Sequence, residues 1–397
     1  MSDKIKVFYS LAFLGGLSFN LIAPFFVIFG LSLGFTIAQV GLLIGISRLA
    51  AFIFEIPTGI YADTYGRKRA ILLTYSLTII SSLIYFFGSF GSNFYLLLIG
   101  SVISGLAITF ITGTFEALLI DNLELTNKEQ LRNKIFIRLS VITSLGFFAG
   151  GLIGSLIAYF NLKYVWLFQS IIASLALIVG WKFIQEKFTT KKIFNGSLNI
   201  GQLIFNQIKN PLNSIFQEKR IYSFFSLAIL LTLANALYLI GWPIIFKDIL
   251  FIPTYYFGII SSIAGVSFLI GSLASEKFSS KKGTFKTLCF CLILIGIFYL
   301  IFALSKNIIF SLISFILIDF FNGGLSPLFY SLLNKFIPSA QRSTILSYYN
   351  LIVEGGAGIG EIIAGNLMII LTAPLVILLS PILIFISLIK FRKLKIE

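Results

Sequence analysis

The chain has 397 residues, of which 58% are hydrophobic and only 11% charged, and its mean hydropathy is +1.00. Soluble domains carry about 25% charged residues, so this composition excludes an ordinary globular protein and indicates one that spans a membrane. The net charge of +15 points to a nucleic-acid partner only weakly, because the lysines and arginines lie between apolar runs.

The residues that most enzymes and metal sites need are scarce. Histidine is absent, which excludes Ser-His-Asp and Cys-His catalysis and histidine metal sites. Cys289 and Cys291 lie in one apolar run and form neither a disulfide framework nor a zinc motif. We therefore expect no enzyme activity, no metal and no cofactor.

Twelve apolar runs are long enough to cross a bilayer, which takes about 20 residues each. The first follows Lys4 and Lys6 and is longer than the core of a signal peptide, so we expect it to remain as the first helix. Breakers or polar residues, such as Pro57 and Asn334, are expected to end several runs. In chain order the runs cover 6–30, 37–58, 70–88, 94–120, 136–158, 164–184, 221–246, 255–275, 285–304, 308–333, 343–370 and 373–390.

The distribution of lysine and arginine predicts the orientation of these helices. With these spans, 26 of the 30 basic residues lie at the termini or in loops on the same side, and Lys163, Lys247 and Lys306 lie on the other. Positive residues favour the cytoplasmic side. We therefore predict that both termini are cytoplasmic and that the protein is a multi-pass protein of the inner (plasma) membrane, surrounded by lipid.

A polar stretch divides the chain into two halves. We predict an all-α membrane protein with an N-terminal six-helix bundle over 1–184, a cytoplasmic linker over 185–220 and a C-terminal six-helix bundle over 221–397. Apolar residues at helical spacing over 200–212 fit either an amphipathic surface helix or a solvated linker. Glycine runs at 146–154 and 355–365 occupy corresponding positions, which indicates two pseudo-symmetric bundles.

The clearest local motif lies between the second and third apolar runs. It reads Gly-Ile-Tyr-Ala-Asp-Thr-Tyr-Gly-Arg-Lys-Arg from Gly59 to Arg69. Gly59 and Gly66 permit close packing or unusual backbone angles, and Asp63 can cap a helix or pair with a nearby arginine. The segment therefore predicts a tight basic turn.

This motif resembles the signature cytoplasmic loop of the major facilitator superfamily, and Glu-Ile-Pro-Thr-Gly at 55–59 and Gly-Thr-Phe-Glu-Ala at 113–117 resemble a bacterial, drug-efflux-like branch of it. The resemblance implies that Asp63 holds the start of the eleventh helix. It also implies that Arg67 pairs with Asp121, and that Glu276 and Arg342 form the weaker counterpart in the second half. These contacts would lock the outward-facing state.

Ionisable residues inside apolar runs are costly and suggest a function. They are Arg48, Glu55, Glu116, Asp319, Glu354 and Glu361. In the resembled fold the second and eleventh helices are neighbours, so Arg48 and Glu354 form a candidate pair, which is either functional or purely structural.

Other polar residues are candidates for the cavity that the resemblance places between helices 1, 4, 7 and 10. Asp319 lies near the middle of the tenth run, one turn before Asn322, and suits a proton carrier or a counter-charge for a cation. Asn20 and Asn235 either line this cavity or make interhelical hydrogen bonds. Glu116 belongs either to the cavity or to the lock.

The intramembrane residues comprise five acids and one base, which disfavours an anionic substrate. We therefore expect a monomeric, proton-coupled exporter of small amphipathic or cationic compounds, which works by alternating access. A proton-coupled importer of a small solute remains the close alternative. A membrane receptor or assembly factor without transport activity is the alternative of another class. The sequence contains no nucleotide-binding loop, so we do not expect ATP to drive the protein directly.

Overall fold

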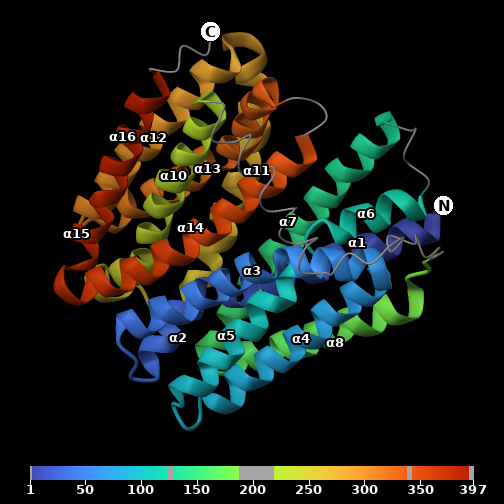
Figure 1. Ribbon diagram of the computed structural model, residues 1–397. Helices are drawn as coiled ribbons and strands as arrows, with labels where there is room; N and C mark the ends of the chain where they lie inside the picture. The colour runs from blue at the N-terminus through green and yellow to red at the C-terminus, as the bar shows by residue number, and fades with distance from the viewer. Residues whose placement is uncertain (1, 124–128, 187–218, 338–341, 393–397) are drawn as a thin grey trace. The chain divides into compact units, whose positions relative to one another are not determined.

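The computed structural model describes residues 2–123, 129–186, 219–337 and 342–392, and within these ranges every regular element is a helix (Figure 1). The first half contains α1 (Ser2–Ile22), η1 (Ala23–Phe25), α2 (Phe26–Ser32), α3 (Ile37–Tyr65), α4 (Arg67–Gly88), α5 (Phe94–Thr109), α6 (Thr114–Asn122), α7 (Glu129–Phe160) and α8 (Tyr164–Phe183). The second half contains α10 (Lys219–Ile244), η2 (Ile245–Ile249), η3 (Thr254–Tyr256), α11 (Phe257–Lys282), α12 (Thr284–Leu304), α13 (Ile308–Phe336), α14 (Arg342–Ile370), α15 (Ala373–Ile377) and α16 (Leu379–Arg392).

Twelve helical spans in the described ranges are long and apolar enough to cross a membrane, which confirms the predicted number. Helices suit such spans because they bond most of their backbone groups within the segment, as the hydrocarbon core of a bilayer requires. The orientation of the termini stays a prediction. The proposed amphipathic segment at 200–212 lies outside the described residues.

Two expected helix ends were wrong. Pro57 lies inside α3 and Asn334 lies inside α13. Proline removes only one backbone donor, and Thr58 Oγ1 donates to the carbonyls of Phe54 (2.8 Å) and Glu55 (3.2 Å) beside it. Neither of these is the carbonyl of Ile53, four residues before Pro57, which loses its helical donor, and α3 continues through the proline nonetheless.

The fourth span, predicted as one helix over 94–120, is interrupted. It consists of α5 and α6, separated by a turn that ends at Gly113, whose φ is +69°. Residues with a side chain rarely adopt a positive φ, whereas glycine does so without a steric clash, so Gly113 allows this turn. The interruption separates the last nine residues of the span from the rest.

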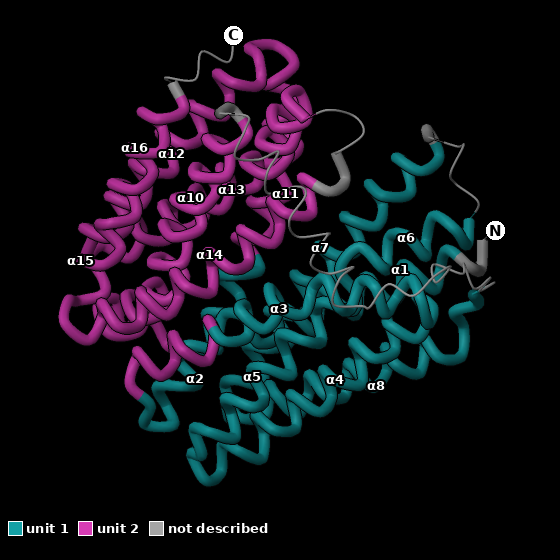
Figure 2. The backbone as a smooth tube through the Cα atoms, viewed as in Figure 1, with its two compact units in different colours: residues 1–35, 46–198, 254–262 teal, residues 36–45, 199–253, 263–397 magenta. Residues whose placement is uncertain are grey.

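The helices form two compact units, coloured separately in Figure 2. Unit 1 contains residues 1–35, 46–198 and 254–262, and unit 2 contains residues 36–45, 199–253 and 263–397. The units follow the two halves of the chain, except that the first turns of α3 belong to unit 2 and the first turns of α11 to unit 1. Two helices therefore contribute to both units.

Within unit 1, α1 packs along α7, and α4 packs along α5 and α8. Glycines make the first of these contacts close: a Cβ at Gly150 would lie 2.3 Å from the carbonyl oxygen of Leu17, and one at Gly146 would lie 2.1 Å from that of Phe13. Small residues allow such approach between membrane helices. The glycine run noticed in the sequence is therefore the surface that receives α1.

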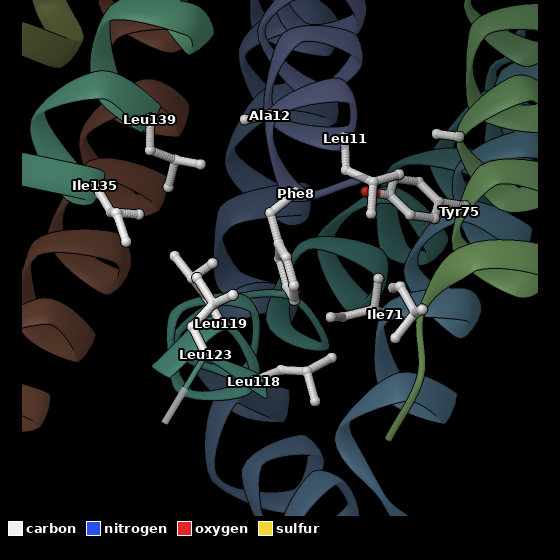
Figure 3. Close-up of a cluster of buried hydrophobic side chains, with 12 residues drawn as sticks. Phe8, Leu11, Ala12, Ile71, Tyr75, Leu118, Leu119, Leu123, Ile135 and Leu139 are labelled. Atoms are coloured by element: carbon white, nitrogen blue, oxygen red, sulfur yellow. The ribbon is translucent and has the colours of Figure 1, made fainter. Parts of the chain in front are cut away.

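A buried apolar cluster joins five elements of unit 1 (Figure 3). Phe8 of α1, Ile71 of α4, Leu118 and Leu119 of α6, and Ile135 of α7 are all at most 3% exposed. The apolar face of α6 is thus packed against the other helices of unit 1.

Within unit 2, α12 packs against α13, and α10 packs against both α14 and α16. A Cβ at Gly323 of α13 would lie 2.0 Å from the backbone oxygen of Phe268, and one at Gly271 of α11 would lie 1.7 Å from that of Phe320. α11 and α13 therefore touch backbone to backbone at the level of Asp319, which fixes the rotation of α13.

Candidate functional site

Asp319 lies near the middle of a membrane span. It follows Ile308, the first residue of α13, by eleven positions, which is about 17 Å along the helix axis. The residue is partly buried. Among the described residues, no lysine or arginine forms an ion pair with it. A carboxylate in this position has no fixed counter-charge within the described part of the chain.

Two buried tyrosines accompany Asp319. Tyr238 of α10 is 3% exposed and Tyr299 of α12 is 1% exposed, and their ring centroids lie 4.9 Å apart. The Tyr299 side chain hydrogen-bonds that of Asn322, and both tyrosine hydroxyls interact electrostatically with the Asp319 carboxylate. Three helices thus bring their polar side chains to one place in unit 2.

Aromatic rings surround this polar group. Tyr238 contacts the rings of Phe302 (5.5 Å) and Phe315 (5.9 Å), and Trp242 packs on Phe315 with centroids 5.0 Å apart. Phe315 precedes Asp319 by four residues, so both lie on the same face of α13. The side chains packed around Tyr238 on this side are therefore aromatic.

These surroundings limit how Asp319 can exist. An isolated charge in an apolar medium is strongly disfavoured, so the group must be protonated, hydrogen-bonded or neutralised by a mobile cation. The Tyr238 hydroxyl is buried and has no hydrogen-bond partner among the described residues, a state that costs about 1–3 kcal/mol. The cluster thus suits a carboxyl group, Asp319, that gains and loses a proton or binds a mobile cation.

A second candidate site lies at the turn between α3 and α4. The turn consists of Gly66 alone, whose φ of +107° requires glycine. Arg67 begins α4, and its Nη1 lies 2.5 Å from Asp121 Oδ2, while its Nη2 lies 3.4 Å from Asp63 Oδ1. The contact between Arg67 and Asp121 is the one the sequence motif implied; its part in locking a conformation stays a prediction.

Gly59 behaves differently from Gly66. It lies within α3, with no positive φ, and a Cβ there would meet nothing within 4 Å in the described structure. Neither close packing nor an unusual backbone angle explains this glycine.

Sequence reasoning missed Glu186 at this site. Its carboxylate accepts hydrogen bonds from the backbone N–H groups of Arg67 (2.8 Å) and Lys68 (2.9 Å), and so caps the start of α4. In return, Lys68 Nζ donates to the carbonyls of Trp181 (2.9 Å) and Ile184 (2.6 Å) at the end of α8. The two helices cap each other, although their residues are far apart in the sequence.

Glu116 lies in the first turn of α6, after the interruption at Gly113, and is exposed. A carboxylate in that position interacts favourably with the partial positive charge of the helix start. Asp121 belongs to the last turns of the same short helix. α6 therefore carries one carboxylate at its start and a second in the Arg67 pair.

Asn20 of α1 is fully buried and hydrogen-bonded within unit 1. Its Nδ2 donates to the backbone oxygen of Phe147 (2.9 Å), and its Oδ1 accepts from Ser261 Oγ (2.8 Å). Ser262 Oγ donates to the backbone oxygen of Phe148 (2.9 Å). These bonds match the interhelical alternative for Asn20 and tie α1, α7 and the start of α11 together.

The pairings expected of the remaining candidates stay predictions. Arg48 lies in unit 1 and Glu354 in unit 2, so their pairing stays a prediction. Asn235 is exposed on α10. The side chain of Arg342 lies outside what the structure describes, so the pair with Glu276 also stays a prediction.

Comparison with protein families gives one match over most of the chain. The family model described as Major Facilitator Superfamily matches residues 8–361 of this chain. PmrA, a multi-drug resistance efflux pump of Streptococcus pneumoniae serotype 4, is 25% identical over 365 residues, which are 90% of this chain and 87% of PmrA.

Two further relatives match over shorter stretches. YxaM, an MFS-type transporter of Bacillus subtilis (strain 168), is 27% identical over 55% of this chain and 52% of its own length. The quinolone resistance protein NorA of Staphylococcus aureus (strain MRSA252) is 27% identical over 45% of each chain. The chain thus spans about half the length of these two relatives.

Solved structures share the fold. The crystal structure of the nucleoside transporter NupG, in a mutant form, superposes with a TM-score of 0.79 at 16% identity, over 98% of this chain and all of that chain. A bacterial homologue of the iron transporter ferroportin, in an inward-facing state, gives 0.73 at 12% identity over 98% of both chains. At these identities the similarity concerns the fold alone.

Proposed function

Because the chain belongs to the major facilitator superfamily, we propose that it is a secondary active transporter that exchanges protons for small amphipathic or cationic compounds and exports them. It would work by alternating access, as a monomer in the bacterial plasma membrane. Asp319 would carry the proton or hold the positive charge of the substrate.

The observation that carries this proposal is a carboxyl group near the middle of a membrane span with no basic partner among the described residues. An unpaired charge in a membrane has a high free energy, so a proton or a cation must neutralise this group. Intramembrane acids of this kind usually have a function. A site that takes either one, but not both, exchanges them. This competition is the simplest form of antiport.

Export is favoured by the relatives. PmrA, which matches 90% of this chain, is described as a multi-drug resistance efflux pump, and NorA as a quinolone resistance protein. Import of a small solute together with protons is the rival proposal, and the direction of proton movement distinguishes the two.

We also infer that the contacts around Arg67 form a cytoplasmic lock. The bond between Arg67 and Asp121 joins the start of α4 to the end of α6 within unit 1. Asp63 would hold the start of α14 in the same state. Opening of the cytoplasmic side would break these contacts.

The test uses purified protein in proteoliposomes with an imposed pH gradient and a panel of cationic dyes and small solutes. Wild-type protein is compared with Asp319→Asn, which cannot lose a proton. The matched control is Asp248→Asn, the same chemical change at an exposed position of unit 2 at the end of a span. We expect gradient-driven dye movement in the wild type and the control, and none in Asp319→Asn.

Other results would change the proposal. Movement of a solute in the same direction as the proton would establish the importer instead. Coupled flux that Asp319→Asn leaves unchanged would remove Asp319 from the mechanism.

A further inference from the structure

The hydroxyl of Tyr238 is one of several buried side-chain polar atoms for which the described structure provides no hydrogen-bond partner, and it is the one that lies beside Asp319. Tyr238 is 3% exposed, and its Oη makes no hydrogen bond to the described residues. A buried phenol ordinarily finds a hydrogen-bond partner. Its ring is held on two sides, by Tyr299 at 4.9 Å and by Phe302 at 5.5 Å, so the side chain has little freedom to turn elsewhere.

The packing places this hydroxyl beside one face of α13. Phe315, Asp319 and Asn322 follow each other at intervals of four and three residues, so they form a row on that face. Tyr238 contacts Phe315 at one end of the row (5.9 Å). Tyr299, whose ring is tilted by 50° against that of Tyr238, hydrogen-bonds Asn322 at the other end. Asp319 lies between these two contacts.

We propose that the Tyr238 hydroxyl is a positioning group that donates a hydrogen bond to the Asp319 carboxylate whenever that group has lost its proton. This inference rests on the proposed role of Asp319 in proton coupling. A carboxylate is an acceptor only and needs donors, whereas a protonated carboxyl brings its own O–H group. In the described structure the hydroxyl makes no such bond, and the proposal assigns the bonded hydroxyl to the deprotonated state of the cycle.

No covalent bond of Tyr238 changes in this scheme. The O–H bond of Asp319 breaks and its proton passes to water or to the medium. The phenol keeps its own proton and turns it toward the carboxylate. The scheme therefore needs no reactant other than the proton that the transport cycle already moves.

Other titratable groups on the neighbouring helices of unit 2 are Tyr299, Cys289 and Cys291 on α12, Glu276 on α11, and Glu354 and Glu361 on α14. Of these, Tyr299 is already engaged by Asn322. Glu276 lies five residues beyond Gly271, which faces Phe320, and so is about 7.5 Å further along α11. None of these residues is altered when only the hydroxyl of Tyr238 is removed.

The test is the pH dependence of transport in Tyr238→Phe. Loss of a donor to the carboxylate makes Asp319 hold its proton to higher pH. We therefore expect the pH of half-maximal gradient-driven flux to rise by about half to one pH unit, with maximal flux retained. The control is Tyr85→Phe, which removes the hydroxyl of a buried tyrosine of unit 1 that bonds Ser101, and it should leave this pH unchanged.

A second variant keeps the size of the side chain. Difluorotyrosine at position 238 retains the hydroxyl and makes it a stronger donor, so the half-maximal pH should fall rather than rise. This substitution tests the same hydrogen bond if the phenylalanine variant does not accumulate.

The outcomes separate this inference from the proposed function. An unchanged half-maximal pH in both Tyr238 variants, with coupling still abolished in Asp319→Asn, would overturn the inference and leave the function standing. Coupled flux that survives in Asp319→Asn would overturn both.

Discussion

At the scale of single residues, Asp319 was predictable because an acid inside an apolar run is rare and costly. Tyr238 and Tyr299 were not, since the chain has 16 tyrosines and most fit an apolar run as well as these two do. Only the packing of α10 and α12 on α13 shows which of them meet the carboxyl group.

Glu186 escaped prediction for a related reason. It caps a helix that begins 119 residues earlier, and no spacing rule connects positions so far apart. The sequence predicted a basic turn and the partner of Arg67, but not the carboxylate that holds the start of α4.

Replacing Glu186 with Gln should destabilise unit 1. The amide keeps the size of the side chain but loses the charge that two backbone N–H groups of α4 bind. We expect a loss of about 1 kcal/mol, the usual value of a helix cap, measured as a lower midpoint of thermal unfolding in detergent. Gln185→Ala, at the exposed neighbouring position, is the control. An unchanged midpoint would mean that Glu186 contributes nothing to the start of α4.

Replacing Asp121 with Asn should affect transport more than stability. The side chains of Arg67 and Asp121 are 27% and 64% exposed, and an exposed ion pair is worth no more than about 1 kcal/mol. If the pair favours one state of the cycle, that energy shifts the balance between states by up to about fivefold. We expect flux to fall within that range while the unfolding midpoint changes little.

A charge exchange supplies the check on this prediction. The double variant Arg67→Asp with Asp121→Arg should recover part of the flux that either single change removes. Lys182→Gln, at an exposed cation of α8, should have no effect. Failure of the double variant to improve on either single change would count against a lock made by this pair.

At the scale of elements, the interruption between α5 and α6 was not predictable from hydropathy. The run over 94–120 has Glu116 as its one charged residue, and a window of about 19 residues averages over a four-residue turn. Gly113 was the local signal, but it is one of 33 glycines. Pro57 gave the opposite error: it was expected to end a helix, but α3 continues through it.

Replacing Gly113 with Ala should therefore cost stability through the backbone alone. No atom lies within 4 Å of a Cβ at that position in the described structure, so any loss reflects the φ of +69°. The expected cost is about 1–2 kcal/mol, measured by thermal unfolding. Gly59→Ala, inside α3 with equally open space, should be neutral or slightly stabilising, because alanine favours helix. Equal effects of the two substitutions would contradict the conformational explanation.

At the scale of the whole molecule, the number of spans followed from hydropathy because each apolar run is long and separated by polar residues. The compact units could not be read in the same way. Residues 36–45 and 254–262 pack with the other half of the chain, and contacts of this kind depend on the rotation and tilt of helices. Sequence alone sets neither.

The glycine runs link the two scales. They were visible in the sequence as corresponding features of the two halves, and in unit 1 the run in α7 receives α1, with Gly151 also meeting the start of α11 at Gly258. The sequence predicted that small residues would be contacts, but not which helices they would touch.

The central claim is that substrate movement and proton movement are obligatorily coupled through Asp319. The most direct test loads proteoliposomes with a transported cation and a pH indicator, and follows the internal pH after the cation is allowed to leave, with no imposed pH gradient. We predict that the interior acidifies as the cation leaves in the wild type and in Asp248→Asn, and that no pH change occurs in Asp319→Asn. Cation movement without any pH change in the wild type, or acidification that persists in Asp319→Asn, would contradict this account.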